Sequence, residues 1–200
     1  MMPDLKTLLG QVWSSIARPR DVARWVMSFD MPLRHRWEVL LLVVVLSVIA
    51  AHVSIVYIAR AQAFVMGELV LNPWTTGLLQ LTVLVAAVFA VQVIGRAMGG
   101  QGRLQDAILL VAWLQFCLLC LQVVQTLFLM VMPPIAGLIG IAGFVLFFWL
   151  LSNFVAEMHG FRSLGLVFAM IIVSLLSIIF ALSLILTLLG FAVPGASFDV

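Results

Sequence analysis

The sequence contains few charged residues. Lys, Arg, Asp and Glu make up 9% of the 200 residues, whereas 65% are apolar and the mean hydropathy is +1.28. A soluble domain carries about 25% charged residues, so this chain could not cover a water-facing surface. Ten Lys and Arg against eight Asp and Glu leave a net charge of only +2. These shortages exclude a soluble globular enzyme, a nucleic-acid-binding protein and a disordered chain.

Cysteine is equally scarce, since the chain has only Cys117 and Cys120. Their C-x-x-C spacing would suggest redox chemistry in a soluble fold. Here both residues lie inside an apolar run, where a thiolate is disfavoured and zinc would lack two further ligands. We therefore expect no structural disulfide, no metal site and no cofactor.

Long uncharged runs are what the sequence has in abundance. The 21 residues between Glu38 and Arg60 would form about 31 Å of helix, which matches a hydrocarbon core of about 30 Å. The 50 residues between Asp106 and Glu157 allow two crossings, because adjacent prolines at 133 and 134 break a helix near the middle. The sequence predicts an all-α, polytopic membrane protein with five transmembrane helices, at residues 39–59, 75–95, 106–131, 135–156 and 164–189.

The basic residues predict the orientation of these helices. With five spans and a cytoplasmic N-terminus, nine of the ten fall on the cytoplasmic side: Lys6, Arg18, Arg20, Arg24, Arg34, Arg36, Arg96, Arg103 and Arg162. Only Arg60 falls on the other side. Since cytoplasmic loops are enriched in Lys and Arg, we expect a cytoplasmic N-terminus and a non-cytoplasmic C-terminus. The high Arg content suggests a GC-rich genome and fits a bacterial inner membrane.

The N-terminal segment, residues 1–36, has a helical period of apolar residues and no recognisable cleavable signal peptide. Its first apolar stripe consists of Leu5, Leu8, Leu9, Val12, Trp13 and Ile16, and a second follows Pro19 with Val22, Trp25, Val26 and Phe29. Amphipathic helices with Trp and basic residues lie in the headgroup plane. We expect a cytoplasmic interfacial segment that either packs under the bundle or binds anionic lipid or a partner. Residues 37–190 then form the transmembrane domain, and 191–200 form a short non-cytoplasmic tail.

Three local motifs carry a resemblance to a known family. They are Gly-Gly-Gln-Gly-Arg-Leu-Gln-Asp-Ala at 99–107, Glu-Met-His-Gly-Phe-Arg-Ser at 157–163, and Arg-Pro-Arg at 18–20. In this order on five spans, the chain from about residue 10 to 190 resembles the bacterial branch of the Yip family, whose name means Ypt-interacting protein. The resemblance implies a five-helix membrane protein without known catalysis. Eukaryotic relatives act in vesicle trafficking and membrane shaping with Rab-type GTPases, which they contact through a longer N-terminal region. Here that region is short and basic, so we do not expect Rab binding.

The charged residues near the predicted cytoplasmic side are candidate contacts for a partner or for lipid. They are Arg18, Arg20, Arg24, Arg34, Arg36, Arg103, Asp106, Glu157, His159 and Arg162. The later loops could bring several of them together as interfacial ion pairs, as a partner or lipid site, or as a metal site. We expect Asp106 to pair with Arg103 or Arg162, because charges at this depth need partners. The glycine run at 99–102 lacks the Gly-Lys-Ser/Thr ending of a phosphate-binding loop and is interpreted as a flexible surface turn.

Polar residues inside the spans are candidate helix–helix contacts: His52, Gln115, Gln122 and Gln125. Buried amides bond between helices, although a proton, ion or solute path would use the same residue types. Small residues form matching stripes that let helices approach closely. These stripes are Ser47, Ala51 and Ser54, then Ala136, Gly140 and Gly143, then Ser174, Ser177 and Ala181.

These features predict a non-catalytic membrane protein of Yip type. Its role would be that of a membrane organiser, a scaffold or a partner-binding subunit, in homo- or hetero-oligomers within the bilayer. Two alternatives remain open at the level of sequence. One is a small permease or channel, which the glutamine stripe and His52 would serve. The other is an accessory or assembly subunit of a respiratory or photosynthetic membrane complex.

Overall fold

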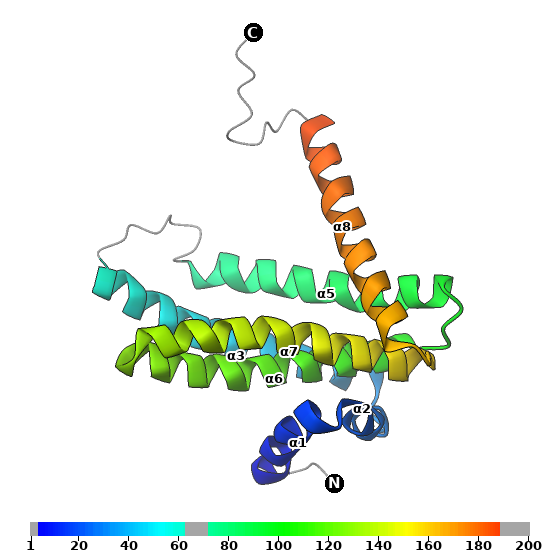
Figure 1. Ribbon diagram of the computed structural model, residues 1–200, viewed down its shortest axis with the longest axis horizontal. Helices are drawn as coiled ribbons and strands as arrows, with labels where there is room; N and C mark the ends of the chain where they lie inside the picture. The colour runs from blue at the N-terminus through cyan, green and yellow to red at the C-terminus, as the bar shows by residue number, and fades with distance from the viewer. Residues whose placement is uncertain (1–3, 63–71, 189–200) are drawn as a thin grey trace.

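The computed structural model describes residues 4–62 and 72–188, and the regular structure of this part is entirely helical (Figure 1). The helices are α1 (Leu5–Ala17), α2 (Pro19–Met27), α3 (Leu33–Gln62), α5 (Pro73–Ala97), α6 (Leu104–Val131), α7 (Pro133–His159) and α8 (Leu164–Leu188). Five of them, α3 and α5 to α8, are long and apolar enough to cross a membrane. The predicted all-α fold class with five transmembrane helices is therefore confirmed. The predicted tail 191–200 lies outside the described residues.

Prolines and caps set several helix boundaries. Arg18 separates α1 from α2, and Pro19 begins α2 at a position where a missing N–H costs nothing. Asn72 caps α5, since its side-chain oxygen accepts a hydrogen bond of 2.9 Å from the Trp74 amide. Pro133 begins α7, and Gly160 ends it in the left-handed conformation at a φ of 75°. The sequence therefore encodes these breaks locally, through the residues that cannot continue a helix.

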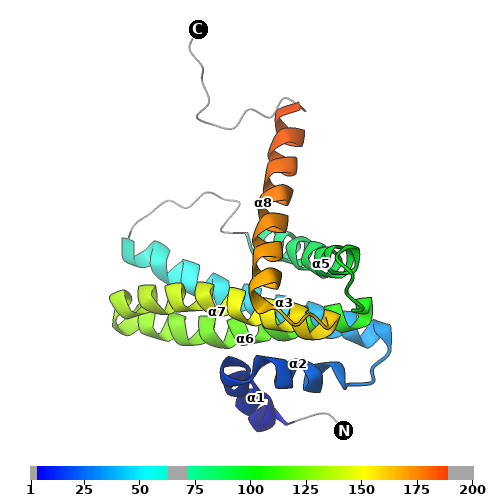
Figure 2. The same cartoon turned by 45° about the vertical axis from the view of Figure 1, so that its right-hand side comes forward.

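Helix α6 lies at the centre of the molecule. Its eight consecutive residues 107–114 are all buried, so every face of these two turns is covered by protein. The neighbours are α3, α5 and α7 within the bundle and α2 on the flank, and Figure 2 shows α3, α6 and α7 side by side. A helix that is apolar all round and buried all round is the core of its domain. The core lies near the end where α6 begins and α7 ends.

The N-terminal helix pair, α1 and α2, packs against the flank of α6 and α7 (Figures 1 and 2). Trp113 on α6 donates its indole N–H to the Ser15 hydroxyl at 3.0 Å. Trp149 on α7 donates to the carbonyl of Ile16 at 3.3 Å. The ring of Trp25 on α2 contacts the ring of Trp113 edge to face, with centroids 5.5 Å apart. The amphipathic segment is thus part of the packed molecule.

Helix α8 leaves the bundle at a steep angle (Figure 1). Among the described side chains of α8, those that pack on the bundle are near its beginning, where Val167 contacts Val155 and Ala156 of α7. Farther along, large apolar side chains such as Leu176 and Phe180 are exposed. Apolar side chains exposed along a span are what lipid tails would cover. Two members of the predicted small-residue stripe on α8, Ser177 and Ala181, are exposed as well.

Candidate functional site at the charged end of the bundle

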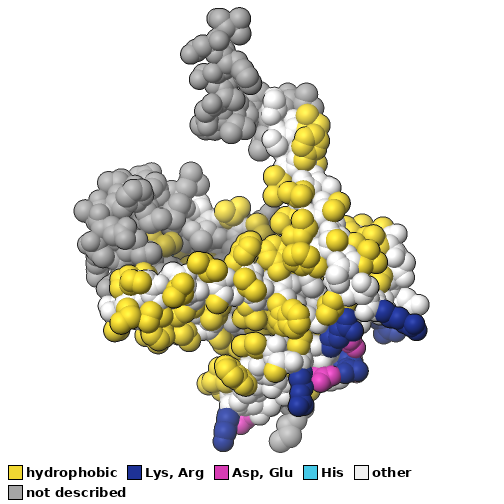
Figure 3. Space-filling model, viewed as in Figure 1, with side chains coloured by type: hydrophobic (Ala, Val, Ile, Leu, Met, Phe, Trp, Pro, Cys, Tyr) yellow, Lys and Arg dark blue, Asp and Glu magenta, His cyan; other side chains and the backbone are white. Residues whose placement is uncertain are grey.

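Charged side chains gather at one end of the molecule, whereas yellow apolar side chains cover the helix bodies (Figure 3). At this end α3, α6 and α8 begin, and α5 and α7 finish. We refer to it as the charged end. The N-terminal helix pair lies beside it and adds its own charged residues. The candidate site is therefore built from the ends of five helices and from the α2–α3, α5–α6 and α7–α8 connections, which are far apart in the sequence.

Arg36, in the first turn of α3, is buried at the charged end with 5% of its surface exposed. Its guanidinium donates to the carbonyl oxygens of Phe29 at 3.2 Å, Met31 at 3.0 Å and Gln105 at 2.8 Å. It also donates to the Asp106 carboxylate at 3.3 Å. A guanidinium has five N–H donors in a fixed fork, so one side chain can satisfy all four acceptors. We refer to this arrangement as the Arg36 clamp, because it joins the α2–α3 connection to the start of α6.

The partner of Asp106 differs from the sequence prediction. Asp106 pairs with Arg36, and not with Arg103 or Arg162. Arg103 is the residue before α6 and is exposed, as is Arg162 in the turn before α8. Asp106 instead faces α3, where its charge meets a buried cation. The prediction was wrong because it considered only the later loops, whereas the partner lies 70 residues earlier in the chain.

His159, the last residue of α7, is enclosed by the glycine-rich loop. Its Nδ1 accepts a hydrogen bond of 3.1 Å from the Gly102 amide, and its Nε2 lies 3.1 Å from the carbonyl oxygen of Val91 on α5. Because Nδ1 accepts, the ring proton is on Nε2, which donates to Val91. The imidazole therefore joins α7, α5 and the loop through both ring nitrogens.

Three glycines make room for this imidazole. A Cβ atom at Gly95 would lie 2.1 Å from His159 Nε2, and one at Gly100 would lie 2.3 Å from Nδ1. At Gly102 the nearest ring atom would be 2.7 Å away. Real Cβ atoms do not approach so closely, and the ring cannot move freely because both nitrogens are bonded. The glycines are needed for close packing.

The glycine run is therefore not a free turn that could hold a phosphate. The Gly102 amide is used by His159, the Gln101 amide donates to the His159 carbonyl at 3.4 Å, and the Gly102 carbonyl accepts from Gln92 at 3.0 Å. A phosphate-binding loop needs its backbone N–H groups pointing at the ligand. The expected flexible surface turn is thus a loop held down on α7 and α5.

The remaining candidate contacts are more exposed. Arg24 pairs with Asp21 and lies 3.6 Å from the Glu157 carboxylate, and Arg34 pairs with Glu38 at 2.9 Å. Exposed pairs of this kind add little stability. Arg20 is half-buried, and its Nε has no hydrogen-bond partner among the described residues. Arg34, Arg96, Arg103 and Arg162 are also exposed at this end, and Arg18 is exposed at the corner between α1 and α2.

The intramembrane glutamines bond between helices. Gln115 donates to the Ser47 hydroxyl on α3 at 3.1 Å, and Gln125 donates to the Ala136 carbonyl on α7 at 3.1 Å. The hydroxyls of Ser54 and Thr126 join α3 to α6 at 2.6 Å. The structure places the side chains of Gln122 and His52 in half-buried positions on α6 and α3.

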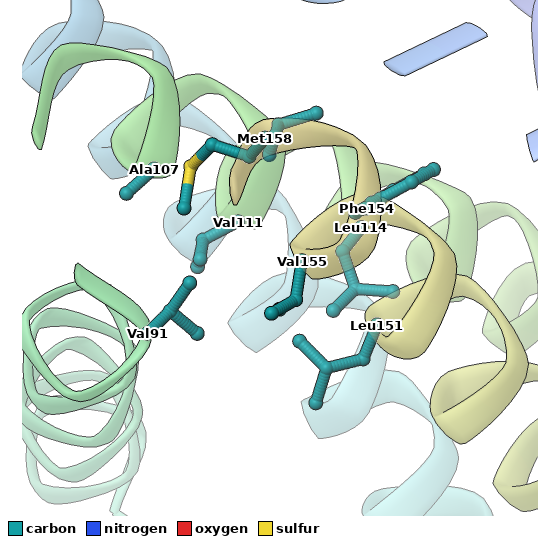
Figure 4. A pocket seen from close by; sticks show the side chains of 9 residues that line it. Val91, Ala107, Val111, Leu114, Leu151, Phe154, Val155 and Met158 are labelled. Carbon is teal, nitrogen blue, oxygen red and sulfur yellow. The ribbon is translucent and has the colours of Figure 1, made fainter. Parts of the chain in front are cut away.

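The packing between α5, α6 and α7 leaves almost no free space. The void there has a volume of about 10 Å³ and a wholly apolar lining, which includes Val91, Val111 and Val155 (Figure 4). This is about the space for one water molecule, and a water needs polar partners that the lining does not supply. This part of the bundle is a packed seam and offers no room to a solute.

The two cysteines are both free. Cys117 is buried with its sulfur 3.8 Å from the Ser15 hydroxyl, and Cys120 is half-buried. In residues 4–62 and 72–188, no three His, Cys, Asp or Glu side chains come together as a possible metal site.

Several residues of the site carry no signal in the sequence. Gln92 and Gly95 on α5 enclose the imidazole and its loop, and Ser15 receives the Trp113 indole. Each looks like an ordinary residue of an apolar or amphipathic helix. Their roles depend on contacts with residues far away in the chain, which periodicity does not reveal.

The helices, their apolar lengths and their polar ends define a polytopic α-helical membrane protein with a helix pair docked on its flank. The family model described as the Yip1 domain matches residues 13–185. Because this match covers most of the chain, the protein belongs to the Yip1 domain family, and the Yip resemblance is confirmed. Among curated proteins and solved structures, no match to the chain was found.

Proposed function

We propose that this Yip-type protein is a non-catalytic organiser of a bacterial inner membrane that acts as a scaffold or partner-binding subunit. The observation that carries the proposal is that the charged end has two groups of residues, one bonded inside the protein and one exposed. Arg36, Asp106 and His159 are engaged in internal contacts that hold the helices together. Arg34, Arg103 and Arg162 are left exposed on this frame. The result is a firmly held cationic surface.

The partner of such a surface would be acidic. Exposed arginines attract carboxylates and phosphates over distances up to the Debye length, about 8 Å at physiological salt, and bind them through bidentate hydrogen bonds. Partner binding would therefore weaken as the salt concentration rises. Small-residue stripes and interhelical amides would support lateral association with other membrane proteins.

The test compares the wild type with the triple variant R34Q/R103Q/R162Q after purification in mild detergent. Quantitative mass spectrometry of the native preparation measures which proteins and phospholipids remain bound. We expect a defined set to stay with the wild type at low salt and to fall several-fold in the variant. The control K6Q also removes one exposed cation, but away from the charged end, and should keep the set. A monomer that retains neither protein nor phospholipid would contradict the proposal.

The same proposal places the charged end in the cytoplasm. This orientation follows from the positive-inside rule applied to the arginines of the α2–α3, α5–α6 and α7–α8 connections. Reporter domains fused after residues 65, 132 and 198 should all be outside the cytoplasm, and fusions after residues 100 and 162 should be inside. The measurement is the paired activity of alkaline phosphatase and a fluorescent protein. One reporter on the wrong side would overturn the orientation and leave the fold unaffected.

A further inference from the structure

The corner between α1 and α2, residues 15–19, contacts the bundle well away from the charged end. Ser15 accepts from Trp113 at 3.0 Å and lies 3.8 Å from the Cys117 sulfur on the same helix. The neighbouring carbonyl of Ile16 accepts from Trp149 on α7 at 3.3 Å. Contacts with both helices therefore fix the level of the corner along the bundle.

The distance of the corner from the charged helix ends can be estimated by counting residues along α6 and α7. Trp113 is seven residues beyond Asp106 and Cys117 is eleven, which at 1.5 Å per residue places them about 10 and about 16 Å along α6. Trp149 lies eight residues before Glu157, about 12 Å along α7. The headgroup layer on each side of a bilayer is only about 5–8 Å thick. If Asp106 and Glu157 lie at the surface, the corner lies below the headgroups.

Helix α1 has apolar side chains on two faces. Leu8 and Val12 pack against the core, and Ser15 between the helices is fully buried. On another face Leu5, Leu9, Trp13 and Ile16 are 66%, 50%, 76% and 44% exposed. These four follow one another at steps of four, four and three residues, so they form a single stripe. A helix lying on a membrane surface needs one apolar face, whereas a helix between a bundle and acyl chains needs two.

We propose that α1 and the corner are inserted among the acyl chains of one leaflet, as a wedge beside α6 and α7. The acyl chains of that leaflet cover the stripe of Leu5, Leu9, Trp13 and Ile16. This differs from the sequence expectation, which placed the segment flat in the headgroup plane. The wedge is attached to the bundle by the Trp113 and Trp149 hydrogen bonds, and the α2–α3 connection is held by the Arg36 clamp.

The first residues of α1 limit this insertion. Asp4 and Lys6 are exposed, and the Thr7 hydroxyl and amide, both hydrogen-bonded to Asp4, lower the pKa of that carboxyl. These two charges, and the exposed Arg18 at the corner, draw headgroups and water toward them and thin the bilayer locally. The wedge therefore adds volume to one leaflet and thins it on one side of the bundle. Deformation of this kind would organise a bilayer, and to that extent it rests on the function proposed above.

The depth of the wedge is measured on the full-length chain in vesicles of phosphatidylcholine and phosphatidylglycerol. In a C117A/C120A background, single cysteines at positions 13, 34 and 45 carry a nitroxide label. Val45 on α3 is an exposed position seven residues beyond Glu38, and Arg34 is exposed at the charged end. The ratio of accessibility to oxygen and to a water-soluble nickel complex reports the depth. We expect position 13 to give a ratio close to that of position 45, about tenfold above position 34. A ratio closer to that of position 34 overturns the wedge.

A second measurement avoids the cysteine replacements. Bromine atoms placed low on the acyl chains quench tryptophan at that depth, and the difference between wild type and W13F isolates Trp13. Quenching by chain-brominated lipid should exceed quenching by lipid brominated near the headgroup by at least twofold. The reverse order overturns the wedge.

The double variant L9Q/W13Q separates insertion from partner binding. We expect the wild type to prefer small over large vesicles by several-fold and the variant to lose this preference. The variant should keep the partners that depend on Arg34, Arg103 and Arg162. The control L41Q/L42Q also places two glutamines at exposed apolar positions, on α3, and should retain the vesicle preference. If L9Q/W13Q keeps the vesicle preference, the proposal that the wedge deforms the bilayer is wrong. Failure of the arginine variant would leave the measured depth unaffected.

Discussion

At the scale of single residues, His159 determines what can stand at three positions around it. Gly95, Gly100 and Gly102 come from a helix end and a loop, yet each lies against the same imidazole ring. The ring is held at both nitrogens, by the Gly102 amide and the Val91 carbonyl. The close packing here therefore depends on the imidazole and all three glycines together, and not on any one glycine.

We predict that Gly95→Ala destabilises the protein by about 1–3 kcal/mol, the usual cost of overpacking a filled core. The new methyl group would meet His159 at 2.1 Å, so the ring or the helix must move. The midpoint of thermal unfolding in detergent measures the effect. In an H159A background the same Gly95→Ala change should cost nothing, because the ring is absent.

Gly137→Ala is the matched control for this prediction. It makes the same change inside α7, where a Cβ atom would meet nothing within 4 Å. There the substitution should be neutral or stabilising by about 0.5–1 kcal/mol, because alanine restricts the unfolded chain. Equal losses at positions 95 and 137 would show that helix propensity, and not the imidazole, explains both.

Residue contacts of this kind were the least predictable from the sequence. The motif at 99–102 and the ionisable His159 were both recognised, but their mutual contact spans 57 residues. Arg36 was grouped with exposed basic residues, although it is the buried partner of Asp106. Composition and spacing identify which side chains need a partner. They do not identify the partner when it comes from a distant helix.

At the scale of elements, the Arg36 clamp links the α2–α3 connection to α6. We predict that Arg36→Gln lowers the free energy of unfolding by about 2–4 kcal/mol. This is below the full cost of breaking a buried ion pair because Asp106 keeps some contact with solvent. Arg36→Lys should recover only part of the loss, since an ammonium group cannot reach four acceptors in a planar fork. Thermal or denaturant unfolding of the detergent-solubilised protein measures both.

Arg34→Gln is the control on the same helix. Arg34 is exposed and pairs only with Glu38 at 2.9 Å among the described residues, so its loss should cost less than about 1 kcal/mol. Protease digestion adds a second readout. If the clamp holds the connection in place, cleavage after Arg24 and Arg34 becomes faster in Arg36→Gln. Unchanged cleavage together with unchanged stability would mean that the clamp does not hold these elements.

Whole elements were more predictable than their contacts. The uncharged runs and the prolines at 19, 73 and 133 mark breaks that the structure shows as helix boundaries. The reason is physical, because proline lacks an N–H and a bilayer leaves few alternatives to helix. The packing of α1 and α2 against the bundle was one of two alternatives that the sequence left open, and the sequence could not decide between them. A Leu and Trp stripe looks the same whether it faces lipid or a neighbouring helix.

At the scale of the whole molecule, the packed core lies toward the charged end, and α8 is mostly outside it. We predict that Phe154→Ala costs about 3–5 kcal/mol, because this side chain is 2% exposed within the core. Phe180→Ala, at a side chain that is 70% exposed on α8, should change stability by no more than about 0.5 kcal/mol. Thermal unfolding of both variants in the same detergent provides the comparison. Similar losses would indicate that α8 is packed in solution as tightly as α7.

The packing of the N-terminal helix pair against α6 and α7 has a consequence for the synthesis of the chain. The carbonyl of Ile16 bonds to Trp149, which is 133 residues later. At about 5–20 residues per second, a ribosome needs roughly 7–27 s to make that interval. During this time the first two helices have left the ribosome, but α7 does not yet exist. Helices α1 and α2 therefore reach their final packing late, although they are synthesised before α7. For those seconds their exposed leucines and tryptophans are available to chaperones, to the insertion machinery or to a nascent neighbour.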